Sequence, residues 1–248
     1  MERILSYDRH VKSRESFFPF LDRMGNKIPD DLRQATACLC IGTCTGLTET
    51  GFFQRCMPNV NEILAVEPDG PSCNALKETM SDTFPAAALT VCKEKVDTWS
   101  GPHKPVDVVT MFHMLYYVPR SKRPDVYRRC FEEWLKPGGW AVISIDRNRS
   151  CFYHKILEHL PADCNRRISA TADNILQELE QGGYNIEMHV YHFQVEIDTS
   201  DVEQSNYVSF SAEFTGCDET TVLNAIKMAV PARKGVHDDT LILAKVRE

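Results

Sequence analysis

The chain has 248 residues, a net charge of −7 and enough apolar sequence to bury one sizeable core. An acidic chain has no excess positive field, so its composition argues against a protein that coats nucleic acid or an anionic membrane. None of its ten cysteines forms a Cys-x-x-Cys pair with histidines at ligand spacing, so we expect no metal site.

The first residues lack the apolar core of a signal peptide, and no apolar run is long enough to span a bilayer. We therefore expect a cytoplasmic protein. Apolar residues at roughly helical spacing over residues 8–24 suggest a lid-like helix, in which Pro19 would cause a kink or a break into two short helices. A packing helix without ligand contact would produce the same pattern.

From residue 37 onward, apolar runs recur at intervals that suit alternating strands and helices. Strands are expected at Ala37–Ile41, Glu62–Val66, Ala88–Cys92, Val106–Phe112, Trp140–Ile145, Ile186–Ile197 and Thr240–Val246. Helices are expected at Thr48–Cys56, Ser72–Thr83, Arg123–Leu135, Cys151–Leu160, Thr171–Glu180 and Glu219–Met228. This order predicts an α/β protein of Rossmann-like type, with a mostly parallel seven-stranded sheet and helices on both faces.

We expect a single domain over residues 1–248. Lys136-Pro-Gly-Gly139 is predicted to end one helix, because proline forbids continuation and glycine supplies a positive φ. The polar, turn-rich segment 198–235 is predicted to be an insertion between the last two strands. A basic cluster is most simply interpreted as a solvated helix face; it comprises Arg120, Lys122, Arg123, Arg128 and Arg129.

The segment Cys38–Gly46 has the form of a nucleotide-binding turn. An apolar run breaks at Gly42, a second glycine follows at Gly46, and the next apolar run ends in Glu67, twenty-one residues later. Glycines let the backbone turn tightly against a ligand, and an acid at the tip of the second strand accepts hydrogen bonds from ribose hydroxyls. Cys44 replaces the usual middle glycine, and Leu47 offers no third one, so S-adenosylmethionine fits this turn better than a dinucleotide does.

Two later segments resemble class I methyltransferases, namely Trp134-Leu-Lys-Pro-Gly-Gly-Trp140 and the strand and loop Asp107–Val118. The run Met114-Leu-Tyr-Tyr-Val118 more narrowly resembles the histamine N-methyltransferase family. Weaker similarity to that family extends over most of the chain; it is carried by Glu15-Ser-Phe, Val66-Glu-Pro, Lys93-Glu94 and Asp239-Thr-Leu.

This resemblance implies S-adenosylmethionine as the cofactor. The implied contacts are the backbone around Gly42, the ribose site at Glu67, and residues around the nucleoside and the methionine part; they comprise Gly42, Thr43, Gly46, Glu67, Ser72, Val96 and Phe112. Glu67 could instead be a surface acid at the end of a strand. Ser72 could instead cap the helix that follows it.

The acceptor side is implied to involve His113, Tyr116, Tyr117, Tyr153, Asp239 and Arg149. His113 titrates near neutral pH and could take a proton from an amine, while Tyr117 would help to orient the acceptor. The resembled family has glutamine at the position of His113, asparagine at that of Asp239, and tryptophans at those of Tyr153 and Arg149. Asp239 therefore favours a cationic acceptor, and Arg149 is either a contact for a substrate carboxylate or an exposed strand-end residue.

The sequence thus predicts a monomeric methyltransferase that acts on the nitrogen of a small amine, imidazole-like or amino-acid-like molecule. Two alternatives stay open. One is transfer of the methyl group to oxygen in a small acid. The other is a methyltransferase fold that has lost catalysis and acts as a binding module, as the missing middle glycine suggests. A dehydrogenase is a fourth and weaker hypothesis.

Overall fold

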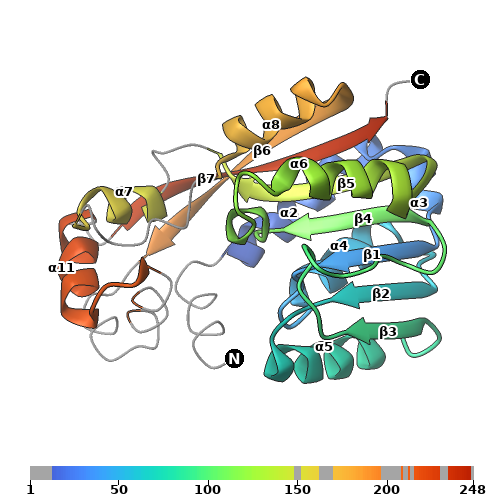
Figure 1. Cartoon of the computed structure of the whole chain (residues 1–248), viewed down its shortest axis with the longest axis horizontal. Helices are drawn as coiled ribbons and strands as arrows, with labels where there is room; N and C mark the ends of the chain where they lie inside the picture. Colours follow the sequence, from blue (N-terminus) through green and yellow to red (C-terminus); the bar gives the residue numbers. More distant parts are fainter. Residues whose placement is uncertain are drawn as a thin grey trace.

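The computed structural model describes residues 13–147, 152–161, 170–196, 208, 212, 215–229 and 234–246. Within them, seven strands form one sheet in the order β3-β2-β1-β4-β5-β7-β6 (Figure 1). The strands are β1 Ala37–Ile41, β2 Glu62–Val66, β3 Ala88–Cys92, β4 Val106–Phe112, β5 Leu135–Asp146, β6 Tyr184–Glu196 and β7 Lys234–Val246. Strands β1 to β5 run parallel, and β7 is antiparallel to both of its neighbours.

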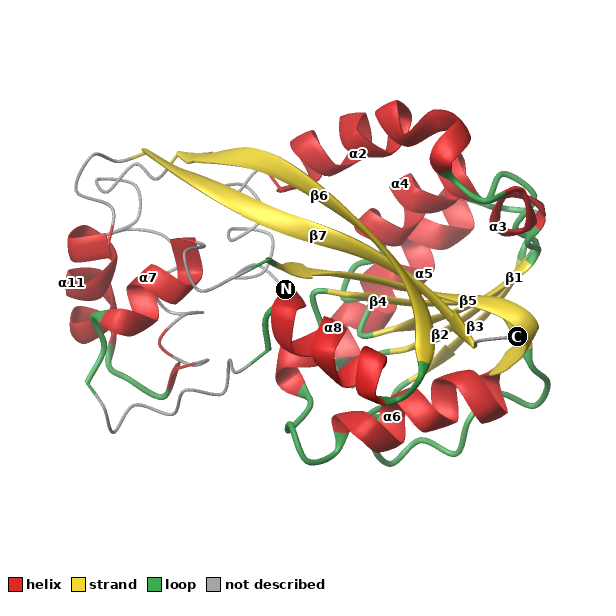
Figure 2. Cartoon of the chain, turned by 90° about the horizontal axis from the view of Figure 1, so that it is seen from above, coloured by secondary structure: helices red, strands yellow, loops and turns green. Residues whose placement is uncertain are grey.

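The helices cover both faces of this sheet, as Figure 2 shows. They are α2 Ser13–Met24, α3 Asp30–Gln34, α4 Leu47–Cys56, α5 Gly70–Thr83, α6 Arg123–Arg129, α7 Phe152–Glu158, α8 Ala172–Gln181 and α11 Glu219–Ala229. Short 3-10 turns lie at Gly25–Lys27 and Leu115–Tyr117, and a π turn lies at Cys130–Trp134. The predicted fold class is therefore confirmed.

Alternation of side chains along the strands divides the core into two layers. Apolar residues of α2, α4 and α5 pack on one face of the sheet, together with Cys38, Cys40 and Val142. Apolar residues of α6 and α8 pack on the other face, against Leu39, Ile41 and Ile143. Because β1 is buried on both sides, its five residues are all apolar.

Three local predictions change in the structure. Pro19 lies within one continuous helix, α2. The helical segment ends at Trp134, as expected, but Pro137-Gly-Gly lies inside β5 as a bulge, because Leu135 pairs with Val106 whereas Trp140 already pairs with Val108. The last strand begins at Lys234 rather than at Thr240, so it overlaps the end of the insertion predicted at 198–235.

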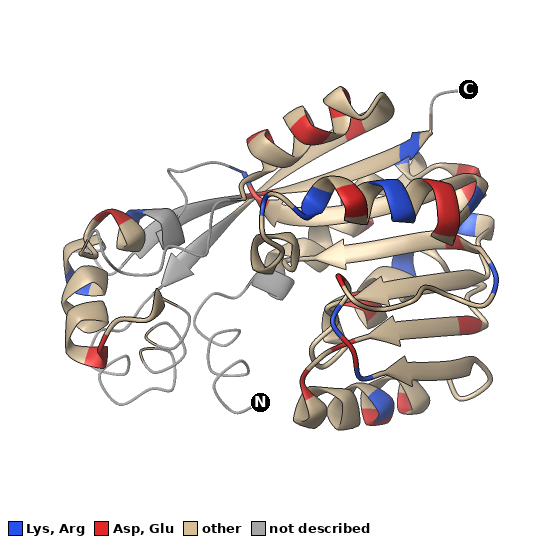
Figure 3. Cartoon of the chain, in the orientation of Figure 1, with Lys and Arg blue, Asp and Glu red and all other residues tan. Residues whose placement is uncertain are grey.

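The basic residues on α6 are not all solvated. Charges of both signs alternate along this helix (Figure 3). Arg123, however, is fully buried, and its guanidinium makes two hydrogen bonds of 2.9 and 2.7 Å to the carboxylate of Glu178 on α8. The interpretation as a solvated face is therefore wrong for Arg123, which joins two helices beneath the surface.

Helices α7 and α11 pack against each other beyond the carboxyl ends of the parallel strands (Figure 1). In the chain, α7 follows β5, whereas α11 lies between the long strands β6 and β7, which extend past the rest of the sheet. The carboxyl edge of the sheet therefore faces these two helices. No helix in the described part of the chain is long and apolar enough to cross a membrane.

Candidate functional site

A tight turn joins β1 to α4. Gly42, Cys44 and Gly46 all have positive φ values, of 66°, 49° and 75°. A Cβ atom added at Gly42 would lie 2.7 Å from the Cβ of Met114, in the loop after β4. The absence of a side chain at Gly42 thus lets the turn approach the His113 loop closely, and the two motifs found in the sequence meet in space.

Cys44 adopts a left-handed backbone conformation that costs a non-glycine residue roughly 1 kcal/mol. Its N–H donates a 2.8 Å hydrogen bond to Oε2 of Glu67, which offsets part of that cost. The sulfur of Cys44 lies 3.9 Å from the hydroxyl oxygen of Ser72. Cys44 thus takes the positive φ that a middle glycine would have, and its contacts to Glu67 after β2 and to Ser72 on α5 hold it there.

Glu67, directly after β2, is 6% exposed and points into the turn. Its Oε1 accepts a second hydrogen bond of 2.9 Å, from the N–H of Asp69. Burial raises the pKa of Glu67, and the two backbone N–H groups partly oppose that shift. The carboxylate is therefore held in one orientation while each oxygen keeps a lone pair for a further donor.

The N-cap of α5 is Asp69, whose Oδ2 accepts from the N–H of Ser72 at 2.8 Å. The hypothesis that Ser72 caps this helix is therefore wrong, and its buried side chain is left beside Cys44. Val96 is buried in the loop between β3 and β4. Phe112 ends β4, and its ring packs edge-on against Phe17 and Phe52 at centroid distances of 5.8 and 5.4 Å.

A row of three polar residues crosses β5, β7 and β6. Asp146 is paired in register with Asp239, and Asp239 is paired with Tyr191. Residues directly opposite one another in neighbouring strands point to the same face of a sheet, here the face covered by α2. Together with His113 and Ser144, these residues form what we call the His113 cluster.

Close contacts connect the members of the His113 cluster. Nε2 of His113 lies 3.2 Å from Oδ2 of Asp239, and Nδ1 lies 3.8 Å from Oδ1 of Asp146. The hydroxyl of Tyr191 donates to Oδ2 of Asp239 at 2.9 Å and lies 3.2 Å from the Ser144 hydroxyl. Two carboxylates directly opposite each other repel, so this cluster favours positive charge between them.

Exposure differs sharply within the cluster. The side chain of Asp239 is completely buried, that of Asp146 is 10% exposed, and that of His113 is 31% exposed. One nitrogen of His113 and one carboxylate oxygen of each aspartate lie within 4.8 Å of one another, close enough to hold a metal ion. Because the imidazole already lies at ion-pair distance from Asp239, which also accepts from Tyr191, we interpret the cluster as an ion-pair site with supporting hydrogen bonds. His113 is the member that faces outward.

Tyr116 and Tyr117 follow His113 in a 3-10 turn. The ring of Tyr116 lies 6.5 Å from that of His113 and 4.8 Å from that of Tyr117. Tyr117 is 53% exposed, yet the protein atoms around its hydroxyl exclude water and raise its pKa. The electrostatic effect of Cys44, Glu67 and Asp146 nearby raises this pKa further. Tyr117 thus stays protonated, acts as a hydrogen-bond donor, and lies between the glycine turn and the His113 cluster.

Comparison with known proteins places this arrangement in a family. The family model for a methyltransferase domain matches residues 8–189. The chain belongs to the methyltransferase domain family. None of the curated proteins matches the sequence. The seven-stranded sheet is accordingly a Rossmann-like methyltransferase fold, and S-adenosylmethionine is the cofactor that fold and family indicate.

Three solved structures illustrate the shared methyltransferase fold. YcgJ from Bacillus subtilis has a TM-score of 0.62 and 12% identity, over 92% of this chain and 98% of that one. The plantazolicin methyltransferase BpumL, in complex with SAH and a triazolic desmethylPZN analogue, has a TM-score of 0.58 and 11% identity over 99% of this chain and 90% of that one. The N-methyltransferase NodS from Bradyrhizobium japonicum WM9 has a TM-score of 0.53 and 11% identity over 92% and 98%.

The glycine turn of this methyltransferase fits the cofactor. Glu67 has lone pairs available for the two ribose hydroxyls, because the two hydrogen bonds that it accepts come from backbone N–H groups, one to each oxygen. The hydroxyl oxygen of Thr43 is buried and has no hydrogen-bond partner in the described part of the chain. An orphaned polar atom in the turn is consistent with a site that a polar ligand completes.

Three residues of the His113 cluster were not identified from the sequence, namely Ser144, Asp146 and Tyr191. Asp146 follows the apolar run 140–145 just as Glu67 follows the run 62–66, so the rule that found Glu67 also applies to it. Tyr191 gave no such signal, because its role depends on strand register. Arg149 lies outside the described residues, as does the side chain of Tyr153.

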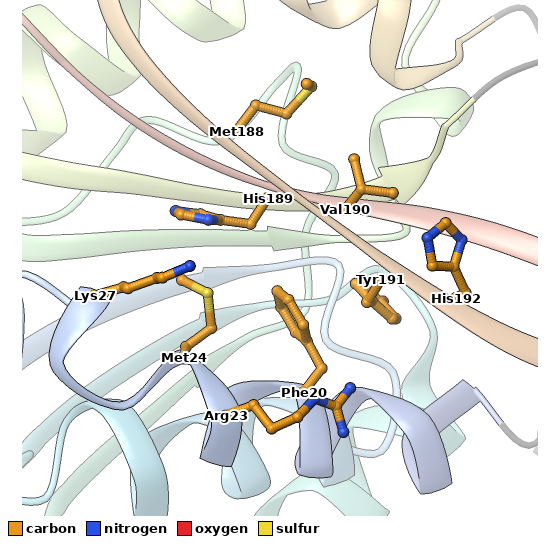
Figure 4. Close-up of a pocket in the computed structure, with 9 residues that line it drawn as sticks. All are labelled: Phe20, Arg23, Met24, Lys27, Met188, His189, Val190, Tyr191 and His192. Carbon is orange, nitrogen blue, oxygen red and sulfur yellow. The ribbon is translucent and has the colours of Figure 1, made fainter.

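A groove of about 480 Å³ lies between α2 and β6, next to the His113 cluster. Its lining includes Phe20, Arg23 and Lys27 on one side and His189 and Tyr191 on the other. Figure 4 shows Phe20 pointing from α2 toward Tyr191, and the two rings stack at a centroid distance of 4.8 Å. Tyr191 thus forms part of the wall between this groove and Asp239.

Proposed function

We propose that this methyltransferase moves the methyl group of S-adenosylmethionine to the nitrogen of a small cationic amine, of an imidazole-like or amino-acid-like kind. One observation carries the proposal. Asp146 and Asp239 lie opposite each other, with His113 between them, at the carboxyl edge of the sheet beside the glycine turn. Ligands of open α/β sheets bind at that edge.

The charge of the His113 cluster supports a cationic acceptor. Two carboxylates and one imidazole carry a net charge of −1 or −2, depending on the protonation of His113. Buried charge of one sign is costly unless a partner of the opposite sign completes it. An ammonium or imidazolium group next to Asp146 supplies that partner, whereas an acceptor carboxylate would add repulsion.

Similarity to known N-methyltransferases gives further support. The run Met114–Val118 resembles the histamine N-methyltransferase family, and NodS, which shares the fold, is an N-methyltransferase. His113 and Asp239 replace a glutamine and an asparagine of the resembled family. Because the carboxylate of Asp239 adds a negative charge and His113 adds a group that can take a proton, we propose a cationic amine other than histamine.

The bound cofactor supplies an electrophilic methyl group on a sulfonium. The protein must align the nitrogen lone pair with that methyl group and exclude water. We propose that Asp146 binds the ammonium, that His113 takes its proton, and that the donor hydroxyl of Tyr117 orients it beside the ring of Tyr116. Asp239 acts through His113, since its own side chain is buried. Tyr153 and Arg149 are proposed as further acceptor contacts from the resemblance alone.

The proposal is tested by incubating the purified protein with methyl-labelled S-adenosylmethionine and a panel of amines, amino acids and small carboxylic acids. Mass spectrometry then identifies which atom carries the label. We expect N-methylated products from cationic acceptors. Replacing Asp146 by asparagine should raise KM for the acceptor about 10- to 100-fold, because a hydrogen bond between charged groups is lost.

Asp82→Asn is the matched control, because Asp82 is exposed on α5 and should leave KM unchanged. Labelled oxygen in the acid acceptors would replace this proposal with an O-methyltransferase. A protein that binds neither S-adenosylmethionine nor SAH in calorimetry would instead be a binding module. An unchanged KM in Asp146→Asn would remove Asp146 from the acceptor site.

A further inference from the structure

We propose that Tyr191 and Asp239 hold the His113 imidazole with its hydrogen on Nε2, which makes Nδ1 the atom that accepts the acceptor's proton. Tyr191 and Asp239 are then positioning residues, and His113 is the catalytic residue. This inference rests on the proposed function, since it names the atom of His113 that takes part in that reaction.

The backbone fixes where the imidazole lies. His113 has a positive φ of 50°, which is uncommon for a residue with a side chain. Its N–H donates a 2.8 Å hydrogen bond to the carbonyl oxygen of Ser144 on β5. The loop after β4 is thereby tied to the neighbouring strand, and the ring is directed across β5 toward β7.

Hydrogen bonds around Nε2 select its protonation. The pKa of Tyr191 is raised well above its ordinary value by burial and by Asp239, so its hydroxyl keeps its hydrogen and donates it to Oδ2 of Asp239. The oxygen of Tyr191 then accepts from the Ser144 hydroxyl, 3.2 Å away. Since the Ser144 hydrogen goes to Tyr191, the Ser144 oxygen, 3.5 Å from Nε2, can only accept there, as the Asp239 carboxylate does at ion-pair distance, 3.2 Å. Nε2 must therefore itself carry the hydrogen that lies between these two acceptors.

The other ring nitrogen faces a different environment. Nδ1 of His113 is 3.8 Å from Oδ1 of Asp146, too far for a hydrogen bond between the two. In the neutral ring with hydrogen on Nε2, the lone pair of Nδ1 accepts a proton from the ammonium held by Asp146. The resulting imidazolium lies between Asp146 and Asp239, which together stabilise its charge.

The proton and electron balance follows. The N–H bond of the ammonium breaks, its proton goes to Nδ1, and its electron pair stays on nitrogen. That pair forms the new bond to the methyl carbon, while the pair of the sulfur–carbon bond returns to sulfur. The products are a methylated ammonium, a neutral thioether and protonated His113, which releases its proton to solvent.

The tautomer can be measured directly by long-range ¹H–¹⁵N NMR on protein labelled at histidine, with the His113 signals assigned by His113→Asn. We expect the neutral ring to carry hydrogen on Nε2 in the wild type. In Tyr191→Phe and in Asp239→Asn we expect a mixture of tautomers. kcat should fall by about 10- to 1,000-fold, within the range of general-base catalysis, with little change in KM.

Tyr184→Phe is the matched control, because Tyr184 lies on the same strand and stacks on Phe131 at 3.9 Å, away from His113. It should change neither the tautomer nor kcat. Thermal melting of each variant separates loss of positioning from loss of folding. If Tyr191→Phe does not fold, Asp239→Asn gives the same comparison.

Hydrogen on Nδ1 in the wild type, or an unchanged tautomer and kcat in both variants, would overturn the inference. So would selective broadening of the His113 signals by substoichiometric Mn²⁺, because the cluster would then be a metal site. The NMR measurement needs neither cofactor nor acceptor. A protein with the expected tautomer but no methyl transfer would therefore fail the proposed function and not this assignment of the proton.

Discussion

Glu67 offers the sharpest test of the proposed cofactor site, because its carboxylate holds the turn and is the group that we propose for the ribose. Glu67→Gln keeps one oxygen that can accept a hydrogen bond and removes the charge. Glu67→Ala removes both acceptors and leaves the N–H groups of Cys44 and Asp69 without the partners that hold them at 2.8 and 2.9 Å. The two variants therefore separate binding from stability.

The expected sizes follow from those contacts. Each backbone N–H that loses its partner costs about 1–3 kcal/mol, so Glu67→Ala should lower the free energy of unfolding by about 2–6 kcal/mol. Cys44 is only half buried and Asp69 is exposed, so water can replace much of this loss, and we expect a value at the low end. Glu67→Gln should retain most of the stability but lose one charge-assisted bond to ribose, about 1.5–3 kcal/mol or a 10- to 100-fold weaker Kd.

Calorimetry with SAH gives the Kd, and urea unfolding without ligand gives the stability. Glu62→Gln is the matched control, since Glu62 lies at the opposite end of β2 in an exposed ion pair with Lys104. It should leave both quantities unchanged. SAH binding by Glu67→Gln with the affinity of the wild type would refute the ribose assignment of Glu67.

The pH dependence of stability gives Glu67 an independent signature. Its folded pKa lies above its ordinary value of 4.5, so the folded protein binds the proton more tightly than the unfolded chain does. The contribution of Glu67 is therefore fully present below pH 4.5 and is lost as the pH rises through the folded pKa. When the free energy of unfolding is plotted against pH, Glu67→Gln should flatten the curve above pH 4.5. An unaltered slope there would contradict the raised pKa of Glu67.

Two further predictions concern the scaffold. Gly46→Ala should destabilise the protein by about 2–4 kcal/mol in urea unfolding, because its Cβ would lie 2.4 Å from Cδ1 of Leu76 at a φ of +75°. Gly138→Ala, with a similar φ of +78° and open space around it, should cost only about 1 kcal/mol, and equal losses would contradict the packing argument. Arg123→Ala should cost about 3–5 kcal/mol because it removes the buried partner of the Glu178 carboxylate. Arg128→Ala, an exposed change on the same helix, should leave the midpoint of urea unfolding where it is, and a comparable shift would show that α6 is simply intolerant of alanine.

Most of the strands and helices could be predicted from local patterns of apolar residues in the sequence. The strand at Ala88–Cys92 has the predicted bounds, and the helix predicted at Thr48–Cys56 begins only one residue earlier. Apolar runs bounded by glycine or by a carboxylate mark such elements well, because burial and turn geometry act on neighbouring residues. The same logic located Gly42 and Glu67, which the structure brings together at the glycine turn.

The residues on the proposed acceptor side could be predicted from the sequence only in part. His113 belongs to a recognisable loop, but its partners come from strands about thirty to more than a hundred residues further along the chain. Tyr191 meets Asp239 because β6 and β7 pair in one register, and a shift of one residue would turn either side chain to the opposite face. Antiparallel register over such distances depends on the whole sheet, so the sequence pattern around Tyr191 could not reveal it. Arg123 was misjudged for a similar reason, since its partner Glu178 lies on another helix.

The position of β7 has a consequence for how acceptor preference can change. The proposed cofactor residues Gly42 and Glu67 follow the first two strands, whereas the proposed acceptor residues Asp146, Tyr191 and Asp239 belong to β5 and to the antiparallel pair at the far side of the sheet. Strand β4 lies between these two halves. Substitutions in the β6–β7 ribbon can therefore remodel the acceptor chemistry while the machinery for the methyl donor stays intact. Descendants of one ancestral chain could in this way acquire new substrates by exchanging residues along a single pair of strands.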